Sequence, residues 1–321
     1  MTSPLATATV RANGIDLHVT EAGSGPLVVL LHGFPELGAS WRHQLQALAA
    51  AGYHAVAPDQ RGYGGSSAPV GVGAYGIHDL VGDVVGLIDA YGVDRAVVVG
   101  HDWGAPVAWH TALLAPARVA GVAGLSVPYV PRPPAPPTAI WRRRLGDVWF
   151  YILYFQEPGV AEADLGRDPA RTLRRMYGGL AGGHPPGDPS AVVRDGRGLV
   201  ERLPEIEDLP AWLDRDDFEA SVAAFTRTGF TGALNWYRNF DANWERTAEL
   251  DGARIAVPAA FVVGAEDPVL AFTPTDDIGR WVPDLRVHRV VDGAGHWVNQ
   301  ERPAEVNAAL LELLGGLDLA G

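Results

Sequence analysis

One aspartate stands at the centre of a Gly-x-Asp-x-Gly pattern that follows a short apolar run and precedes a segment of helical character. The run is Val97-Val-Val99 and the pattern is Gly100-His-Asp102-Trp-Gly104. A strand, a tight turn and a helix in this order form a nucleophile elbow, whose glycines permit strained dihedrals and close backbone approach. Serine usually occupies the centre and acylates, whereas a carboxylate displaces at saturated carbon and leaves an alkyl ester. We therefore predict that Asp102 is a covalent nucleophile, although taken alone it is equally consistent with a helix N-cap.

A histidine and a pair of carboxylates follow two later apolar runs. His296 lies in a glycine-rich loop, and Glu266-Asp267 follow Phe261-Val-Val263. The order nucleophile, acid, histidine is the order of the hydrolytic triad that such an elbow serves. A neutral histidine deprotonates water, while a carboxylate on its other ring nitrogen fixes the tautomer and stabilises the imidazolium. We predict His296 as the base and Asp267 as its orienting acid, with Glu266 as the second choice.

The end of an earlier strand is the alternative place for the acid in some proteins built on such an elbow. Here that place reads Leu125-Ser126-Val127 and holds no carboxylate, which favours Asp267. Considered by itself, His296 would be interpreted as an ordinary surface-loop histidine. Its combination with the elbow and the acid supports the catalytic interpretation.

A further glycine-containing turn, His32-Gly-Phe34-Pro35-Glu36, follows the apolar run Leu27–Leu31. We predict that the backbone N–H groups of Phe34 and Trp103 hold the oxyanion that forms when water attacks an Asp102 ester. A plain Gly-Pro turn is the alternative interpretation of this motif.

These residues follow elements that alternate between strand and helix, and the strands are short continuous apolar runs. Such runs are typical of a mostly parallel sheet whose two faces are covered by helices, so we predict an α/β fold. The predicted strands are Leu27–Leu31, His54–Ala57, Arg95–Val99, Ala259–Val263 and Leu285–Val291, and the predicted helices are Asp79–Tyr91 and Ala304–Leu314.

The alternation stops at Pro131–Pro137, where five of seven residues are proline. This composition excludes a helix or a central strand and predicts a stiff connector. The following segment, to about Leu250, is rich in Trp, Tyr, Phe and Arg at helical spacing. We therefore predict a core from residues 1–130 and 251–321 that is interrupted by a helical cap at residues 131–250.

The composition excludes several classes of function. The chain of 321 residues has a formal net charge of −13, so we expect no nucleic-acid partner and no docking on anionic membranes. Cysteine is absent, which excludes disulfides, thiolate nucleophiles and cysteine-based metal sites. We expect no metal and no organic cofactor. Residues 1–10 show no secretory signal and no apolar run is long enough to span a membrane, so we expect a cytoplasmic protein.

Taken together, these motifs resemble those of the α/β-hydrolase-fold epoxide hydrolases, especially the hydrolase domain of the soluble epoxide hydrolases, over nearly the whole chain. Related forms of the core motifs occur in haloalkane dehalogenases, but two motifs in the predicted cap are more selective. They are Tyr151-Ile-Leu-Tyr-Phe-Gln-Glu-Pro-Gly159 and Leu234-Asn-Trp-Tyr237-Arg-Asn239. The resemblance implies that Tyr151 and Tyr237 reach from the cap toward the epoxide oxygen.

Two phenols also suit the chemistry of an epoxide. Ring opening releases an alkoxide, a poor leaving group unless it is protonated or hydrogen-bonded. Phenols have an ordinary pKa of about 10, so they keep their proton at neutral pH and can donate it. Without the two motifs, packing in an aromatic core would be the first interpretation of Tyr151 and Tyr237, and Tyr154 is a nearby competitor.

We therefore predict hydrolysis of a hydrophobic epoxide to a vicinal diol through an aspartyl ester. The expected partners are the small-molecule epoxide and water, and the sequence leaves a homo-oligomer open. The expected substrate pocket between core and cap is lined by Phe34, Pro35, Trp103, Tyr154, Trp236 and Trp297.

Two other functions use the same residues. Haloalkane or haloacid dehalogenation would also employ Asp102, but a halide leaves without an acid, and Trp103 occupies a position where fluoroacetate-type enzymes typically carry arginine. A non-catalytic ligand-binding protein would have no use for intact Asp102, Asp267 and His296.

Overall fold

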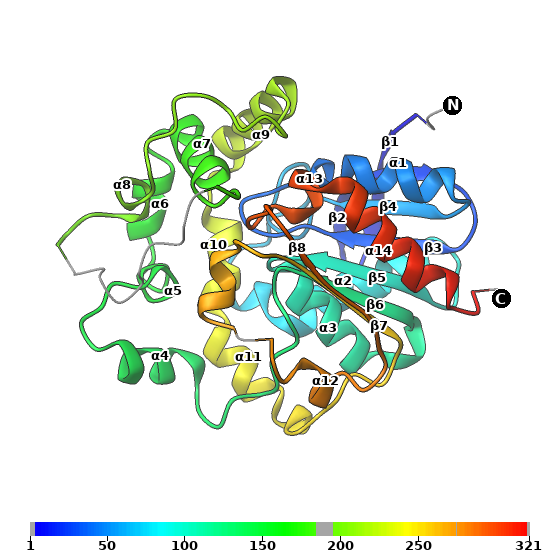
Figure 1. Cartoon of the computed structure of the whole chain (residues 1–321). Coiled ribbons are helices and arrows are strands. Elements are labelled where there is room, and N and C mark those ends of the chain that lie inside the picture. Colours follow the sequence, from blue (N-terminus) through cyan, green and yellow to red (C-terminus); the bar gives the residue numbers. More distant parts are fainter. Residues whose placement is uncertain (1–3, 184–194, 274, 320–321) are drawn as a thin grey trace.

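The structure, a computed structural model, describes residues 4–183, 195–273 and 275–319. Its centre is an eight-stranded sheet in the order β1-β2-β4-β3-β5-β6-β7-β8 (Figure 1). The pairs β1–β2 and β2–β4 are antiparallel, and the other neighbours are parallel. The strands are β1 (Ala6–Ala12), β2 (Ile15–Gly23), β3 (Leu27–Leu31), β4 (His54–Pro58), β5 (Ala96–His101), β6 (Val119–Leu125), β7 (Ala259–Gly264) and β8 (Leu285–Val291).

Helices cover both faces of this sheet, as the apolar strands predict (Figure 1). On one face, Leu45 and Leu310 belong to a buried cluster that joins α1 and α14 to the sheet. On the other face, Leu87 and Val107 join α2 and α3 to a larger cluster that continues toward the helices between β6 and β7. The helices of this part are α1 (Arg42–Ala50), α2 (Ile77–Ala90), α3 (Gly104–Leu114), α12 (Ile278–Trp281), α13 (Val298–Glu301) and α14 (Pro303–Gly315).

The strands and helices predicted from apolar periodicity are present. The predicted strands correspond to β3, β4, β5, β7 and β8, and the two predicted helices correspond to α2 and α14. The antiparallel hairpin of β1 and β2 was not predicted, because the side chains of β1 are largely exposed and form no continuous apolar run. Its turn is built on Asn13 and Gly14, which both have positive φ, as a two-residue hairpin turn of this kind requires.

Between β6 and β7 the described residues form helices and no strand. These helices are α4 (Pro137–Leu145), α5 (Tyr151–Tyr154), α6 (Val160–Leu165), α7 (Pro169–Gly179), α8 (Leu199–Arg202), α9 (Arg215–Thr228), α10 (Thr231–Arg238) and α11 (Phe240–Arg246). The predicted proline connector ends one residue early, since Pro137 begins α4. The first position of a helix tolerates proline because its N–H would have no partner within the helix.

The described residues also form short 3-10 helices. They are η1 (Gly38–Trp41), η2 (Val72–Tyr75), η3 (Pro116–Arg118), η5 (Ala248–Leu250) and η6 (Pro268–Ala271).

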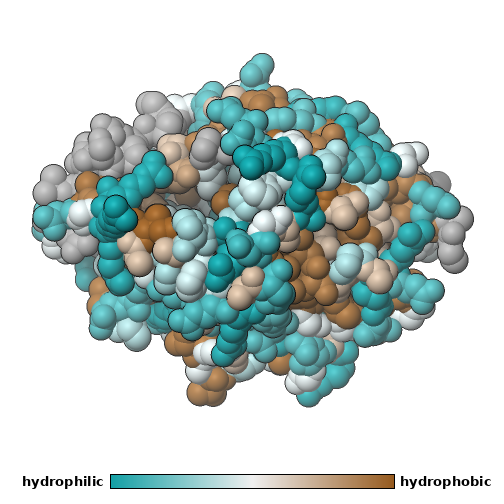
Figure 2. Space-filling view, turned by 90° about the horizontal axis from the view of Figure 1, so that it is seen from below, coloured by the Kyte–Doolittle hydropathy of each residue, from teal (hydrophilic) through white to brown (hydrophobic). Residues whose placement is uncertain are grey.

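The surface is mostly hydrophilic on the face seen from below, with separate apolar patches (Figure 2). Exposed apolar side chains include Val70, Val160 and Val290. Among the residues that the structure describes, no helix has the length and apolar character needed to cross a bilayer.

The turn from β5 into α3 is packed too closely for side chains at two of its glycines. A Cβ on Gly104 would overlap the carbonyl oxygen of Leu31 on β3, and one on Gly100 would overlap the carbonyl oxygen of Gly104. Both obstacles are backbone atoms, which cannot rotate away. The glycines of the elbow are therefore required by close approach of β3, β5 and α3.

We expect Gly104→Ala to destabilise the protein by about 1–3 kcal/mol, as overpacking of a closed site does. The measurement is the midpoint of urea unfolding. Gly315→Ala is the matched control, because it lies in a helix where a new Cβ meets nothing within 4 Å, and it should stabilise by about 0.5–1 kcal/mol. A wild-type midpoint for Gly104→Ala would contradict the close packing.

Candidate active site

The predicted catalytic residues gather at one edge of the sheet. Five neighbouring strands, β3, β5, β6, β7 and β8, are parallel, so their carboxyl ends meet at the same edge. Phe34, Asp102, Ser126, Asp267 and His296 follow these five strands in that order. Side chains 170 residues apart in the chain, those of Ser126 and His296, are thereby brought within contact distance.

Asp102 occupies the tip of the elbow with a φ of 49°, a left-handed conformation that is uncommon for residues other than glycine. Its Oδ1 accepts a hydrogen bond of 2.7 Å from the Phe34 N–H. Its Oδ2 lies 3.5 Å from Nε2 of His296, and its side chain is 16% exposed. Burial would raise the pKa of Asp102, but His296, with His101 and the Phe34 N–H, holds this pKa below its ordinary value. The carboxylate is therefore ionised and enclosed by donors.

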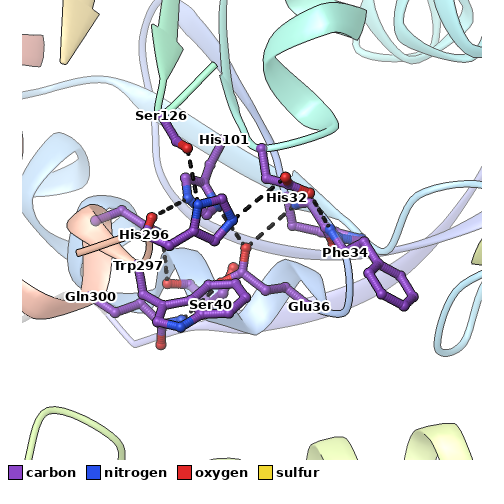
Figure 3. Close-up of polar contacts among 12 residues, drawn as sticks. His32, Phe34, Glu36, Ser40, His101, Ser126, His296, Trp297 and Gln300 are labelled. Carbon is purple, nitrogen blue, oxygen red and sulfur yellow. Dashed lines mark hydrogen bonds and ion pairs between the residues drawn. The ribbon is translucent and has the colours of Figure 1, made fainter. Parts of the chain in front are cut away.

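The other ring nitrogen of His296 faces two side chains. Its Nδ1 lies 3.2 Å and 3.3 Å from the two oxygens of Asp267, and 3.1 Å from Oγ of Ser126. The Ser126 hydroxyl donates to Oδ2 of Asp267 at 2.6 Å. Figure 3 shows the Ser126 side chain directed at the His296 ring. Glu266 instead accepts a hydrogen bond from the N–H of Gly183, so Asp267 is the carboxylate at the imidazole.

His296 is held in its charged form. Burial alone would lower its pKa, but Asp267 and Asp102 together raise the pKa of His296 well above 6.5. In the absence of substrate the imidazole is therefore an imidazolium between two carboxylates. Its backbone is fixed by a 2.8 Å hydrogen bond from its own N–H to the carbonyl of Leu180.

The two predicted tyrosines lie on helices between β6 and β7. Tyr151 begins α5 and Tyr237 lies near the end of α10, with their ring centroids 6.1 Å apart. The centroid of the Tyr237 ring also lies 5.6 Å from that of Phe34 and 5.1 Å from that of Trp103. Burial, and then the negative charge of Asp102, raise the pKa of both phenols. Both therefore keep their protons at neutral pH within the electrostatic reach of Asp102.

Neighbouring residues of the same two motifs fix these tyrosines. The Gln156 side-chain amide donates to the carbonyl of Ile152 on α5 and to that of Tyr237 on α10. Arg238 makes a two-pronged ion pair with Glu162, at 2.8 Å for each oxygen. Such bidentate pairs define orientation as well as distance. The sequence had not identified these two side chains as the ties between α5, α6 and α10.

The predicted oxyanion-hole residues flank Asp102. The N–H of Phe34 already contacts Oδ1 of Asp102. Trp103 is the N-cap residue of α3, and the first N–H groups of a helix have no partner within it. The end of α3 therefore provides donors and the positive end of a helix dipole beside the same carboxylate.

Known proteins are similar to this chain in sequence and in fold. A family profile described as alpha/beta hydrolase fold matches residues 26–303. Epoxide hydrolase A of Mycobacterium tuberculosis is 57% identical over 316 residues, covering 97% of each chain. The crystal structure of epoxide hydrolase A from Mycobacterium thermoresistibile has a TM-score of 0.93 at 54% identity, covering 98% of this chain and 99% of that one.

The chain belongs to the epoxide hydrolases of the α/β-hydrolase fold. An epoxide hydrolase from an endophytic Streptomyces gives the same result, with a TM-score of 0.94 at 44% identity over 97% of this chain and 96% of that one. The prediction of fold class from the sequence is thereby confirmed, and so is the predicted activity.

The remaining predicted pocket residues of this epoxide hydrolase lie in three settings. Pro35 follows Phe34, and its carbonyl accepts a hydrogen bond from Tyr177. Trp236 and Trp297 are 1% and 0% exposed, and their indole N–H groups donate to the carbonyls of Arg61 and Tyr177. The Tyr154 hydroxyl donates to Asp164 on α6, so its proton is already engaged in a hydrogen bond.

A buried acid–imidazole pair behind the triad was not assigned a role from the sequence. Nδ1 of His101 lies 2.8 Å from Glu36, and Nε2 lies 2.7 Å from the carbonyl of His296 (Figure 3). Burial would raise the pKa of Glu36, but His101 keeps this pKa below its ordinary value. Because the carbonyl and the ionised carboxylate only accept, both ring nitrogens of His101 donate. Both residues lie inside the turn motifs that the sequence analysis identified, which is the sequence feature that marks them.

Glu301 holds the loop that carries His296. Its carboxylate accepts hydrogen bonds from the N–H groups of Gly295 and Trp297, on either side of His296, and from Gly182. It lies on α13, five residues beyond His296. No chemical motif marks this position in the sequence, where Glu301 ends a four-residue helix.

We expect Asp102→Asn to lower the pKa of His296. The substitution removes a negative charge that favours the imidazolium, and it imitates the neutral ester. Ring NMR titration of His296 measures the change, and Glu266→Gln is the matched control because that carboxylate binds Gly183 instead. An unchanged titration midpoint in Asp102→Asn would mean that this carboxylate does not govern the imidazole.

Proposed function

We propose that this epoxide hydrolase opens a hydrophobic epoxide by attack of Asp102 and releases the vicinal diol by hydrolysis of the resulting ester. The observation that carries the proposal is the setting of one carboxylate. One oxygen of Asp102 is bound by the Phe34 N–H and the other faces His296, while the charge of Asp102 acts on the buried phenols of Tyr151 and Tyr237.

In the first step, Oδ2 of Asp102 forms a bond to a ring carbon and the carbon–oxygen bond of the epoxide breaks. The electron pair moves to the epoxide oxygen, which takes a proton from a phenol of the Tyr151–Tyr237 pair. The charge of Asp102 raises the pKa of these phenols. As the attack consumes that charge, the phenols become stronger acids at the moment when the alkoxide forms.

In the second step, the neutral ester favours the imidazolium less, so His296 releases its proton to solvent and becomes a base, and it takes up a proton from solvent again once the carboxylate is restored. It deprotonates water, which attacks Cγ of Asp102. The oxyanion forms on Oδ1, where the Phe34 and Trp103 N–H groups support it. Collapse breaks the bond between Cγ and Oδ2, the diol oxygen takes the proton from His296, and the remaining proton of the water restores the phenol.

We further propose that residues 131–250 act as the cap of this enzyme and that residues 1–130 and 251–321 form its core. The described part of the cap supplies both tyrosines, and aromatic rings surround them, including Phe155 at 4.9 Å from Tyr237. An aromatic enclosure favours aryl or alkyl epoxides over charged ones. A cytoplasmic location and a homo-oligomer remain predictions from the sequence.

We expect a single turnover in heavy-oxygen water to place the label on the protein and not on the diol. The new diol oxygen comes from Oδ2 of Asp102 in this mechanism, and the water oxygen enters the carboxylate. Mass analysis of the diol and of the peptide containing Asp102 measures both. Labelled diol in the first turnover would exclude the ester.

We expect Tyr151→Phe combined with Tyr237→Phe to slow epoxide opening by about 10²–10⁴-fold, the usual contribution of general acids. The rate of ester formation in a single turnover is the measurement. Tyr129→Phe is the matched control, since this buried tyrosine donates to the carbonyl of Ala253 away from the site. Near-normal opening in the double variant would show that the phenols are not the acids.

A further inference from the structure

We propose that Ser126 is a positioning residue of the catalytic base, which couples Asp267 to His296 through its hydroxyl. The inference rests on the proposed two-step function and assigns Ser126 to the second step. Ser126 lies after β6, at the alternative place for the acid, where the sequence holds no carboxylate. The structure shows that this position contributes a hydroxyl to the same group of side chains.

The contacts of the Ser126 hydroxyl have a defined direction. A carboxylate only accepts, so the 2.6 Å contact with Oδ2 of Asp267 uses the hydroxyl proton. The lone pairs of Oγ are then free to accept from Nδ1 of His296, 3.1 Å away. Nδ1 of His296 therefore donates a hydrogen bond to Oγ, and the Ser126 hydroxyl donates one to Oδ2 of Asp267.

Oγ is the nearest acceptor of the Nδ1 proton. The oxygens of Asp267 lie farther, at 3.2 Å and 3.3 Å, beyond the roughly 2.7–2.9 Å of strong charge-assisted hydrogen bonds. Asp267 cannot readily move closer, because its Oδ1 is also bound by the N–H of Val269 at 2.9 Å. Ser126 thus connects Asp267 to His296 through two hydrogen bonds, where the direct contacts between these two side chains are long.

The backbone of Ser126 is held in place for this contact. Its φ is 69°, which is unfavourable for residues other than glycine, asparagine and aspartate. Its N–H donates to the carbonyl of Val262 on β7 at 2.9 Å, and the residue is 0% exposed. Serine at this φ is not explained by backbone preference, whereas its hydroxyl makes both of the contacts described.

A bridge at Nδ1 matters most when His296 gains charge. In the first step Asp102 attacks and His296 acquires no proton, so loss of the hydroxyl should have little effect. In the second step His296 takes a proton from water, and the hydroxyl together with Asp267 stabilises the imidazolium. Removal of Oγ should therefore lengthen the lifetime of the ester and lower the pKa of His296. The charged or titratable groups around this ring are Asp102, Asp267, His101 and Glu36.

The test is a single turnover of Ser126→Ala with styrene oxide as the probe, followed by intact-protein mass analysis. We expect ester formation within about twofold of wild type and ester hydrolysis slowed by about 10–100-fold, as for partners that orient a reactive group. The acidic limb of the pH profile of ester hydrolysis should move to lower pH.

Two variants separate the hydroxyl from the fold. Ser126→Gly removes the hydroxyl but suits the positive φ, so it should match the kinetics of Ser126→Ala with a higher urea midpoint. Ser40→Ala is the matched control, because this buried serine has an Oγ without a hydrogen-bond partner, and its ester should hydrolyse at the wild-type rate.

The double variant Ser126→Ala with Asp267→Asn tests the coupling. If the hydroxyl acts through the acid, adding Ser126→Ala to Asp267→Asn should change the ester lifetime by less than about twofold. Fully multiplying effects, or a wild-type ester lifetime and pH profile in Ser126→Ala, would overturn the proposal. Absence of any ester in the wild-type enzyme would instead refute the proposed function.

Discussion

A buried negative charge on Asp102 is the constraint on which the other features of this site depend. A carboxylate withdrawn from water is unfavourable unless donors and a cation compensate for it. The Phe34 N–H and the His296 imidazolium provide this compensation, and each is delivered by a different strand end. At the carboxyl ends of the parallel strands such groups converge without distorting the sheet.

In the proposed mechanism, the same charge connects the two halves of the reaction. Together with burial, it raises the pKa of Tyr151 and Tyr237, and together with Asp267 it raises the pKa of His296. Formation of the ester removes this charge and weakens both effects. One electrostatic interaction therefore makes the acids stronger during ring opening and releases the base for hydrolysis. The elbow's φ of 49° at Asp102 stores backbone strain at the residue that changes its bonding.

Support for His296 comes from side chains that bind its backbone and the backbone of its neighbours. Glu301 fixes the N–H groups beside His296, and His101 fixes its carbonyl while pairing with Glu36. These buried carboxylates each satisfy several donors at once, which is the condition under which a buried charge is tolerated. The base is thereby oriented through its backbone as well as through its ring.

The sequence by itself determined five of the six strands β3 to β8, the helices α2 and α14, and the strand–turn–helix order around Asp102, because apolar periodicity and glycine spacing are local properties. It also contained a hairpin signal at Asn13-Gly14 that was not used. Only the tertiary structure decided which side chains meet. Ser126, Glu36 and Glu301 are ordinary residues in sequence, and their contacts with the triad arise because separate strand ends and loops converge in space. The distances of 3.1–3.3 Å from Nδ1 of His296 to its neighbours are set by that packing, and no local pattern encodes them.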